Sequence, residues 1–155
     1  MDPFPHYYEV AARGEMQGHV RVTSAGAGGL ETAAPAQFGG PGDHWSPETL
    51  LLAAVADCFV LSFRGVARAA RLPWQELACH VEGTLERTGG VTRFTVLRVR
   101  PRLVLADGGS RERALECLDR TKRSCLIANS LQAEVILVPE VIAAPGPERS
   151  AAAGG

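Results

Sequence analysis

The sequence has little net charge, no Cys-x-x-Cys pair and no apolar run long enough to cross a bilayer. Its formal net charge is −1, whereas nucleic-acid-binding proteins usually carry a basic excess or a clustered basic patch. The longest continuous apolar run, residues 50–56, is far short of the roughly 20 residues that a transmembrane helix needs. These absences predict a protein that binds neither nucleic acid nor membrane.

The four cysteines are widely spaced, which does not fit a small secreted disulfide framework or a zinc-binding motif. Residues 1–5 contain no basic region and no apolar run follows them, so no secretory signal is predicted. We therefore expect a cytoplasmic protein with reduced thiols. The sequence shows no nucleotide-binding loop and no Ser-His-Asp arrangement, and its four histidines are scattered. We expect no cofactor and no metal.

The length of 155 residues fits one domain. Strands and helices are segregated along the chain, which favours an α+β fold. We expect a single domain over residues 1–144 and a flexible tail over 145–155, whose composition cannot form a core. The expected elements are strands over 6–12, 19–23 and 30–33, a helix from 47 to 70 or 71, a strand over 76–87 and a second one after the turn at 89–90, helices over 111–123 and from 124, and a strand over 134–138. In the strand after the turn, Leu97, Val99, Leu103 and Leu105 are expected to point inward, and the opposite parity of Phe94 and Val96 predicts a bulge near Val96.

The helix that follows Ser46 has the clearest start signal. Ser46 is a hydroxyl N-cap, Pro47 takes the first helical position, and Glu48 lies in the first turn, where the helix dipole favours a carboxylate. The first turns are apolar on every side, which predicts that the helix begins deep in the core. A meander of short strands covers such a helix only in part, so we expect a second subunit.

Two cysteines lie in settings that point to chemistry. A thiol is a useful nucleophile only as thiolate, and apolar burial raises its pKa. Cys58, inside the apolar helix, would be inert unless a buried cation or hydrogen-bond donor reached it. Cys125 is predicted at the start of a helix capped by Ser124, with Lys122 and Arg123 beside it, so local physics predicts that Cys125 is the more acidic thiol. The alternative is that both are core residues, as buried cysteines commonly are.

Other polar or reactive residues have simpler interpretations. Cys79 faces the interior of a predicted sheet and Cys117 lies at the apolar edge of a predicted helix, so neither requires a chemical role. His44 is interpreted as a capping or surface histidine rather than a base. Glu48 taken alone is interpreted as a helix-dipole carboxylate or, alternatively, as a catalytic group.

Two sequence boxes resemble a known family. The first is Ser-Pro-Glu-Thr-Leu-Leu from Ser46, followed by Ala-Val-Ala-Asp-Cys-Phe around Cys58; the second is Cys-Leu-Ile-Ala-Asn-Ser-Leu from Cys125. With their spacing, they make residues 6–140 similar to the OsmC/Ohr family of osmotically inducible and organic hydroperoxide resistance thiol peroxidases. The resemblance implies an OsmC-like fold, in which segregated antiparallel sheets wrap around long central helices in a swapped homodimer.

The resemblance also implies an activity at the subunit interface. Cys58 would attack a hydroperoxide and become a sulfenic acid, which Cys125 would resolve as a disulfide; a lipoyl or thioredoxin-like dithiol would then reduce it. In the family the counterpart of Glu48 pairs with an arginine from an early strand. Aligned with the family, this chain has Met16 at the position of that arginine. Arg21, or less well Arg13, is therefore the candidate for the cation that pairs with Glu48.

Three functions fit this sequence. The first is a cysteine peroxidase that reduces organic hydroperoxides and, by extension, hydrogen peroxide. The second is an OsmC-like dimer that binds a small apolar molecule in the same pocket. The third is a thiol-based redox sensor that acts through a partner protein.

Overall fold

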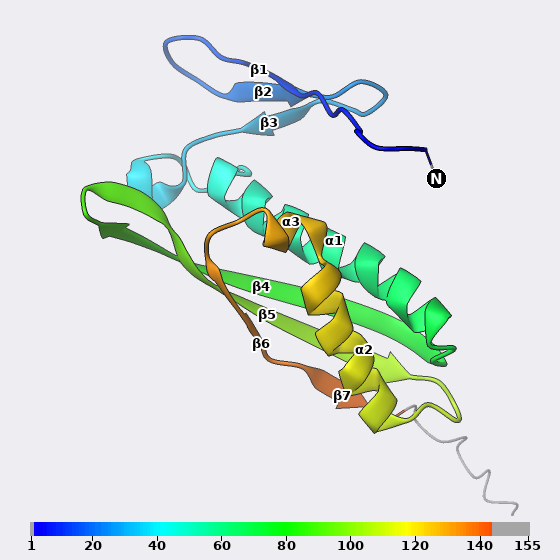
Figure 1. The fold of residues 1–155 in the computed structure, drawn as a ribbon. Coiled ribbons are helices and arrows are strands. Elements are labelled where there is room, and N and C mark those ends of the chain that lie inside the picture. Colours follow the sequence, from blue (N-terminus) through cyan, green and yellow to red (C-terminus); the bar gives the residue numbers. More distant parts are fainter. Residues whose placement is uncertain (1, 144–155) are drawn as a thin grey trace, which may run out of the picture. The chain divides into compact units, whose positions relative to one another are not determined.

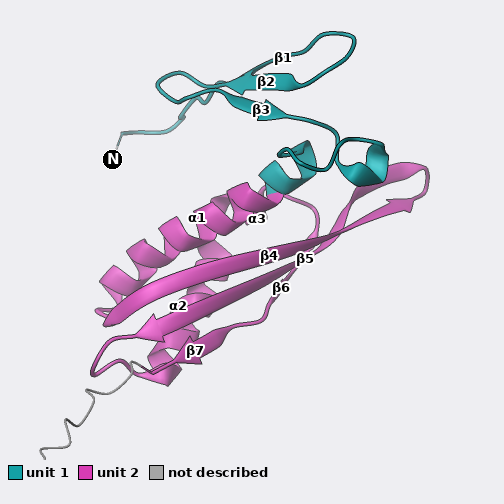
Figure 2. Cartoon of the chain, turned by 180° about the vertical axis from the view of Figure 1, so that it is seen from behind, with its two compact units in different colours: residues 1–51 teal, residues 52–155 magenta. Residues whose placement is uncertain are grey.

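The computed structural model describes residues 2–143 and divides the chain into two compact units, residues 1–51 and 52–155 (Figure 1, Figure 2). The single domain expected over 1–144 stays a prediction. The tail expected over 145–155 lies outside the described residues.

The first unit is a small antiparallel sheet followed by one turn of 3-10 helix and the first turn of a long helix. In chain order its elements are β1 (Ala11–Arg13), β2 (Val20–Thr23), β3 (Leu30–Thr32) and the 3-10 helix (Ala36–Phe38). The strands pair in the order β1-β2-β3. The strand expected over 6–12 starts only at Ala11, which pairs with the last residue of β2, Thr23, so that earlier residues have no partner in β2.

Helix α1 (Pro47–Ala69) begins at the predicted residue. The backbone N–H of Thr49 donates to Ser46 Oγ at 3.2 Å, and the N–H of Ser46 donates to Thr49 Oγ1 at 2.9 Å, which makes a reciprocal cap. At the other end Arg71 has a φ of 51°, and the N–H of Leu72 donates to the carbonyl of Ala67 at 3.0 Å. This left-handed closure, followed by proline, ends the helix.

The burial of α1 differs from the sequence-based expectation. Val55, Phe59, Phe63 and Ala67 are buried, whereas residues 50–54 are only half-buried. An 18-residue window of α1 has a mean hydropathy of 1.9, with 22% of it buried, so by length and composition alone this helix could cross a membrane. The expectation that α1 begins deep in the core is wrong for the single chain.

The second unit is a long hairpin to which two short strands and two helices are added. Its elements after α1 are β4 (Trp74–Thr88), β5 (Val91–Leu105), α2 (Arg111–Ser124), α3 (Leu126–Asn129), β6 (Glu134–Leu137) and β7 (Glu140–Ile142). β5 pairs antiparallel with β4 but parallel with β6 and β7. The expectation of antiparallel sheets is confirmed for β1-β2-β3 and for β4-β5. It is wrong for β6 and β7, because α2 and α3 form a crossover that returns the chain in the same direction.

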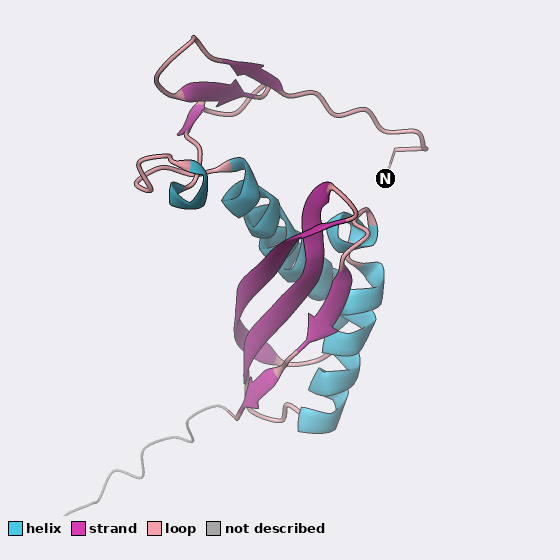
Figure 3. Cartoon of the chain, turned by 90° about the vertical axis from the view of Figure 1, so that its left-hand side faces the viewer, coloured by secondary structure: helices cyan, strands magenta, loops and turns pink. Residues whose placement is uncertain are grey.

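One face of this sheet packs against the helices and the other is exposed (Figure 3). The side chains of β5 that were expected to point inward are buried: Leu97, Val99, Leu103 and Leu105. The alternate residues are exposed: Arg98, Arg100 and Arg102. A bulge lies near Val96, as predicted, because Thr84 pairs with Val96 whereas the next residue, Leu85, pairs with Phe94.

Candidate active site

The structure brings Cys58 of α1 beside Cys125, which lies between α2 and α3. The two thiols interact closely enough that each alters the pKa of the other. Both are free thiols; Cys58 is half-buried, whereas Cys125 is only 1% exposed. Two cysteines that are distant in the sequence therefore form one pair, in which Cys58 is partly exposed and Cys125 is buried.

Cys125, and not Ser124, occupies the N-cap position of α3, with no side-chain capping hydrogen bond. Helix α2 continues to Ser124, Cys125 is extended with φ −68° and ψ 103°, and α3 starts at Leu126. The hydroxyl of Ser124 donates to the carbonyl of Thr121 at 3.3 Å. The predicted Ser124 cap is wrong because this hydroxyl turns back into the last turn of α2.

The surroundings of Cys58 favour its thiolate. Burial acts to raise the pKa of Cys58, but the N–H of Ile127, the thiol of Cys125, the hydroxyl of Ser62 and the N–H of Leu126 all act to lower it, and the pKa ends below its ordinary value. Ser62 follows Cys58 by one helical turn, and its Oγ is 3.9 Å from the sulfur. Sequence reasoning missed Ser62, although the spacing of four was a usable signal.

Cys125 has the opposite electrostatic character. Burial is the main reason that the pKa of Cys125 is raised to about 11; Cys58 adds to the effect, and the N–H groups of Ala128 and Ile127 act against it. Arg123, which was expected to help, pairs with Asp119 on the surface of α2. The prediction that Cys125 is the more acidic thiol is therefore wrong.

The two remaining cysteines both have raised pKa values. Burial, with a smaller effect of charge on Cys125, raises the pKa of Cys79 to about 12. Burial also raises the pKa of Cys117, against the opposing charges of Arg120 and Arg113. Both thiols pack with the hydrophobic core, as expected from the sequence.

We expect iodoacetamide to alkylate Cys58 first, with a pH midpoint below that of an ordinary thiol. A lowered pKa gives more thiolate at neutral pH, whereas Cys125 and Cys79 should react only at strongly alkaline pH. Peptide mass spectrometry over a pH series measures the alkylation midpoint of each thiol. In the denatured chain the differences between these midpoints should disappear. A lower midpoint for Cys125 than for Cys58 would contradict the assignment.

Glu48 lies in the first turn of α1, at a mainly apolar cavity within the first unit. The cavity measures about 410 Å³ and is lined by residues of all three strands, the following loop and the start of α1: Ala12, Val20, Val22, Thr32, Ala33, Ala34, Pro35, Phe38, Pro47, Glu48 and Leu50. Glu48 Oε2 is buried and has no hydrogen-bond partner among the described residues. Because a buried unpaired carboxylate oxygen is costly, this position requires a donor or a cation.

Arg21 does not provide that cation in the described unit. Side chains alternate along a strand, so Arg21 lies on the face of β2 opposite Val22, which lines the cavity with Glu48. Its Nη1 is 4.0 Å from Glu31 Oε1. Arg13 pairs with Arg21 across β1 and β2 and shares its face. The arginine–glutamate pair implied by the resemblance is therefore not formed by either candidate within residues 2–51.

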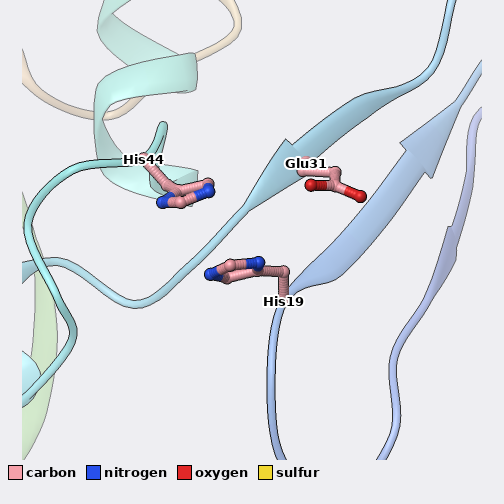
Figure 4. A group of neighbouring side chains, drawn as sticks. All are labelled: His19, Glu31 and His44. Carbon is pink, nitrogen blue, oxygen red and sulfur yellow. The ribbon is translucent and has the colours of Figure 1, made fainter.

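The first unit also brings together three side chains that could hold a metal ion. They are His19, Glu31 and His44, and each offers one ligand atom within 4.8 Å of the others (Figure 4). Sequence reasoning did not predict that His19 and His44 lie together, and the expected absence of a metal stays a prediction. Strand pairing and the bridge between Thr32 and Trp45 create this proximity, and no local sequence pattern signals it.

Comparison with known proteins identifies relatives of this chain. A model of the OsmC-like protein family matches residues 40–139. A protein of Bacillus subtilis, called uncharacterized protein YmaD, is 27% identical over 106 residues, which span 66% of this chain and 71% of the relative.

Several solved structures share the fold. An OsmC-like protein of unknown function from Vibrio cholerae superposes with a TM-score of 0.80 at 17% identity, over 87% of this chain and 99% of that one. An organic hydroperoxide resistance protein from Elizabethkingia anophelis gives 0.74 at 18% identity, over 90% and 98%. The organic hydroperoxide resistance protein OsmC from Legionella pneumophila gives 0.69 at 25% identity, over 90% and 99%.

Proposed function

Because this chain belongs to the OsmC-like family, we propose that it is a thiol-dependent peroxidase that reduces organic hydroperoxides. The observation that carries the proposal is the pairing of an accessible thiol of lowered pKa, Cys58, with a buried thiol of raised pKa, Cys125. The first is suited to attack a peroxide as thiolate, and the second stays protonated until it is needed.

The proposed cycle has three steps. The Cys58 thiolate attacks the terminal oxygen of the hydroperoxide, the O–O bond breaks, and the alcohol leaves with a proton while Cys58 becomes a sulfenic acid. The sulfur of Cys125 then attacks the sulfur of Cys58, the S–O bond breaks, and the Cys125 proton leaves with the hydroxide as water. An external dithiol of the lipoyl or thioredoxin-like kind reduces the resulting disulfide and restores both thiols. This cycle suits the reducing cytoplasm expected from the sequence.

Donors within the second unit support the thiolate in this proposal. The N–H groups of Ile127 and Leu126 and the hydroxyl of Ser62 lower the pKa of Cys58 without any arginine. The proposal therefore does not depend on Arg21. Glu48 enters it only as a buried acceptor that requires a cationic or hydrogen-bonding partner.

We propose that a second copy of the chain packs against the exposed apolar surface of α1. Only 22% of its apolar window is buried, and Leu61 is 52% exposed in the middle of the helix. Apolar surface of this extent on a helix is stabilised by packing against another element. We expect a homodimer, and sedimentation as a monomer at micromolar concentration would contradict it.

Hydroperoxide consumption by the reduced protein tests the activity. We expect tert-butyl hydroperoxide to be consumed in the presence of dihydrolipoamide, with one dithiol oxidised for each hydroperoxide reduced. Protein whose thiols have been alkylated beforehand is the control, and a parallel assay with hydrogen peroxide ranks the two substrates. A rate no higher than that of the alkylated protein would overturn the proposal.

A second candidate function is the binding of a small, largely apolar molecule. The cavity of about 410 Å³ favours it, because its lining is apolar apart from Thr32 and the unpaired carboxylate of Glu48. A ligand with an apolar body and one cationic or donor group fits that chemistry. If the reduced protein lacks peroxidase activity but binds apolar amines in a manner that Glu48→Gln weakens, this second function replaces the first.

A further inference from the structure

We propose that His19, Glu31 and His44 form a binding site for a divalent transition-metal ion, with Zn²⁺ as the expected occupant. The site lies in the first unit and is built from three segments of the chain. Two imidazoles and one carboxylate are a ligand set that Zn²⁺ accepts, with a fourth position left for water. The proposal is separate from the thiol chemistry of Cys58 and Cys125.

Backbone pairing places the three ligands. His19 directly precedes β2, and Glu31 lies in β3, where it pairs with Arg21 of β2. His44 precedes Trp45, whose backbone bridges to Thr32 of β3. A metal ion here would therefore link the β2–β3 hairpin to the segment that leads into α1.

The separations suit a site that closes around its ion. The three ligand atoms lie within 4.8 Å of one another, whereas Zn²⁺ ligands at about 2.1 Å from the metal stand roughly 3.4 Å apart in a tetrahedron. The imidazoles of His19 and His44 are stacked, with centroids 3.9 Å apart and planes inclined by 28° (Figure 4). Coordination thus needs a rotation of these rings, which is accessible because His19 and Glu31 are exposed and His44 is half-buried.

Asp43 provides a second, independent feature of a metal site. Nδ1 of His44 lies 2.6 Å from Asp43 Oδ1, so the protonated Nδ1 donates to the carboxylate. This contact leaves the lone pair of His44 on Nε2, which is the arrangement that carboxylates impose on metal-binding histidines.

Glu31 remains available for a metal. Its one ion pair among the described residues is with Arg21, at 4.0 Å, and the two side chains are 58% and 61% exposed. Such exposed pairs contribute little to stability, so Zn²⁺ can replace Arg21 as the partner of Glu31. Arg21→Gln is accordingly expected to bind Zn²⁺ at least as tightly as the parent chain.

Zinc titration of a thiol-depleted chain tests the site. We would use the Cys58→Ser/Cys125→Ser variant, because thiolates also bind Zn²⁺, and measure binding by competition with a chromophoric chelator. One Zn²⁺ per chain is expected. His19→Ala, His44→Ala and Glu31→Gln should each weaken binding at least about tenfold, and Asp43→Asn by roughly tenfold, as outer-shell partners usually do.

A matched control comes from the surface of β4. His80 lies 3.7 Å from Glu82 and is exposed, so His80→Ala removes a histidine beside a carboxylate without touching the proposed site. Its Zn²⁺ affinity should equal that of the parent chain. An equal loss in His80→Ala and His19→Ala, or no stoichiometric binding at all, would overturn the proposal.

Trp45 offers a second readout that does not use the peroxidase activity. It follows His44 directly and lines the same surface hollow as Glu31 and His44. Co²⁺ should quench its fluorescence in a Trp74→Phe background, and His19→Ala should remove the quenching. A Co²⁺ spectrum with an intense thiolate charge-transfer band in the wild-type chain, unchanged by His19→Ala, would show that the metal sits at the cysteines and would refute the site.

Discussion

Cys58→Ser is expected to abolish hydroperoxide reduction, with kcat/KM lower by on the order of 10³-fold or more. A serine hydroxyl is not ionised at neutral pH and does not attack peroxide oxygen, whereas the Cys58 thiol has a lowered pKa. Hydroperoxide consumption with dihydrolipoamide as reductant measures the effect. Trapping with dimedone, which labels sulfenic acids, should find no adduct in this variant.

The other cysteines provide matched controls for Cys58. Cys79→Ser changes a half-buried thiol near the same pair, and Cys117→Ser changes a buried thiol on α2. Both variants should keep activity within a few-fold of the wild type, because the pKa of each of these thiols is raised and neither acts as nucleophile. Full activity in Cys58→Ser would remove the peroxidase proposal, whatever the controls show.

Local signals in the sequence predicted much of the fold. Ser46 and Pro47 marked the start of α1 to the residue, because caps depend only on neighbouring backbone groups. The parity of apolar residues predicted the buried face of β5 and the bulge near Val96. The parallel pairing of β6 and β7 with β5 was missed. The direction of strand pairing depends on how the crossover packs, and no short segment encodes that.

The proximity of Cys58 and Cys125 was predictable from the sequence, whereas the partner of Glu48 and the electrostatics of the two thiols were not. The two boxes around Cys58 and Cys125 identified the thiol pair. Their relative acidity was misjudged because burial and hydrogen bonding depend on distant elements. Cys125 is buried in the core, whereas backbone N–H groups at the start of α3 donate hydrogen bonds to the Cys58 thiol. The proximity of His19 and His44 was missed for the same reason, because it depends on strand pairing between segments that are distant in the sequence.

Cys125→Ser is expected to keep the first reaction with hydroperoxide and lose turnover with a lipoyl dithiol by roughly tenfold or more. The Cys58 thiolate still attacks, but its sulfenic acid has no neighbouring thiol to expel water and form a disulfide. After one equivalent of hydroperoxide, intact mass should show a chain that has gained one oxygen, where the wild type has lost two hydrogens. Excess hydroperoxide should then drive Cys58 to sulfinic acid.

The resolving role of Cys125 can be separated from that of its neighbour Cys79. Charge on Cys125 contributes to the raised pKa of Cys79, so the two thiols interact electrostatically. Cys79 is therefore the alternative candidate for the resolving thiol. If Cys125→Ser keeps full turnover and the additional Cys79→Ser change removes it, Cys79 is the resolving thiol and the assignment of Cys125 is wrong. If Cys125→Ser alone accumulates the dimedone-reactive form, the buried thiol between α2 and α3 is the group that closes the cycle.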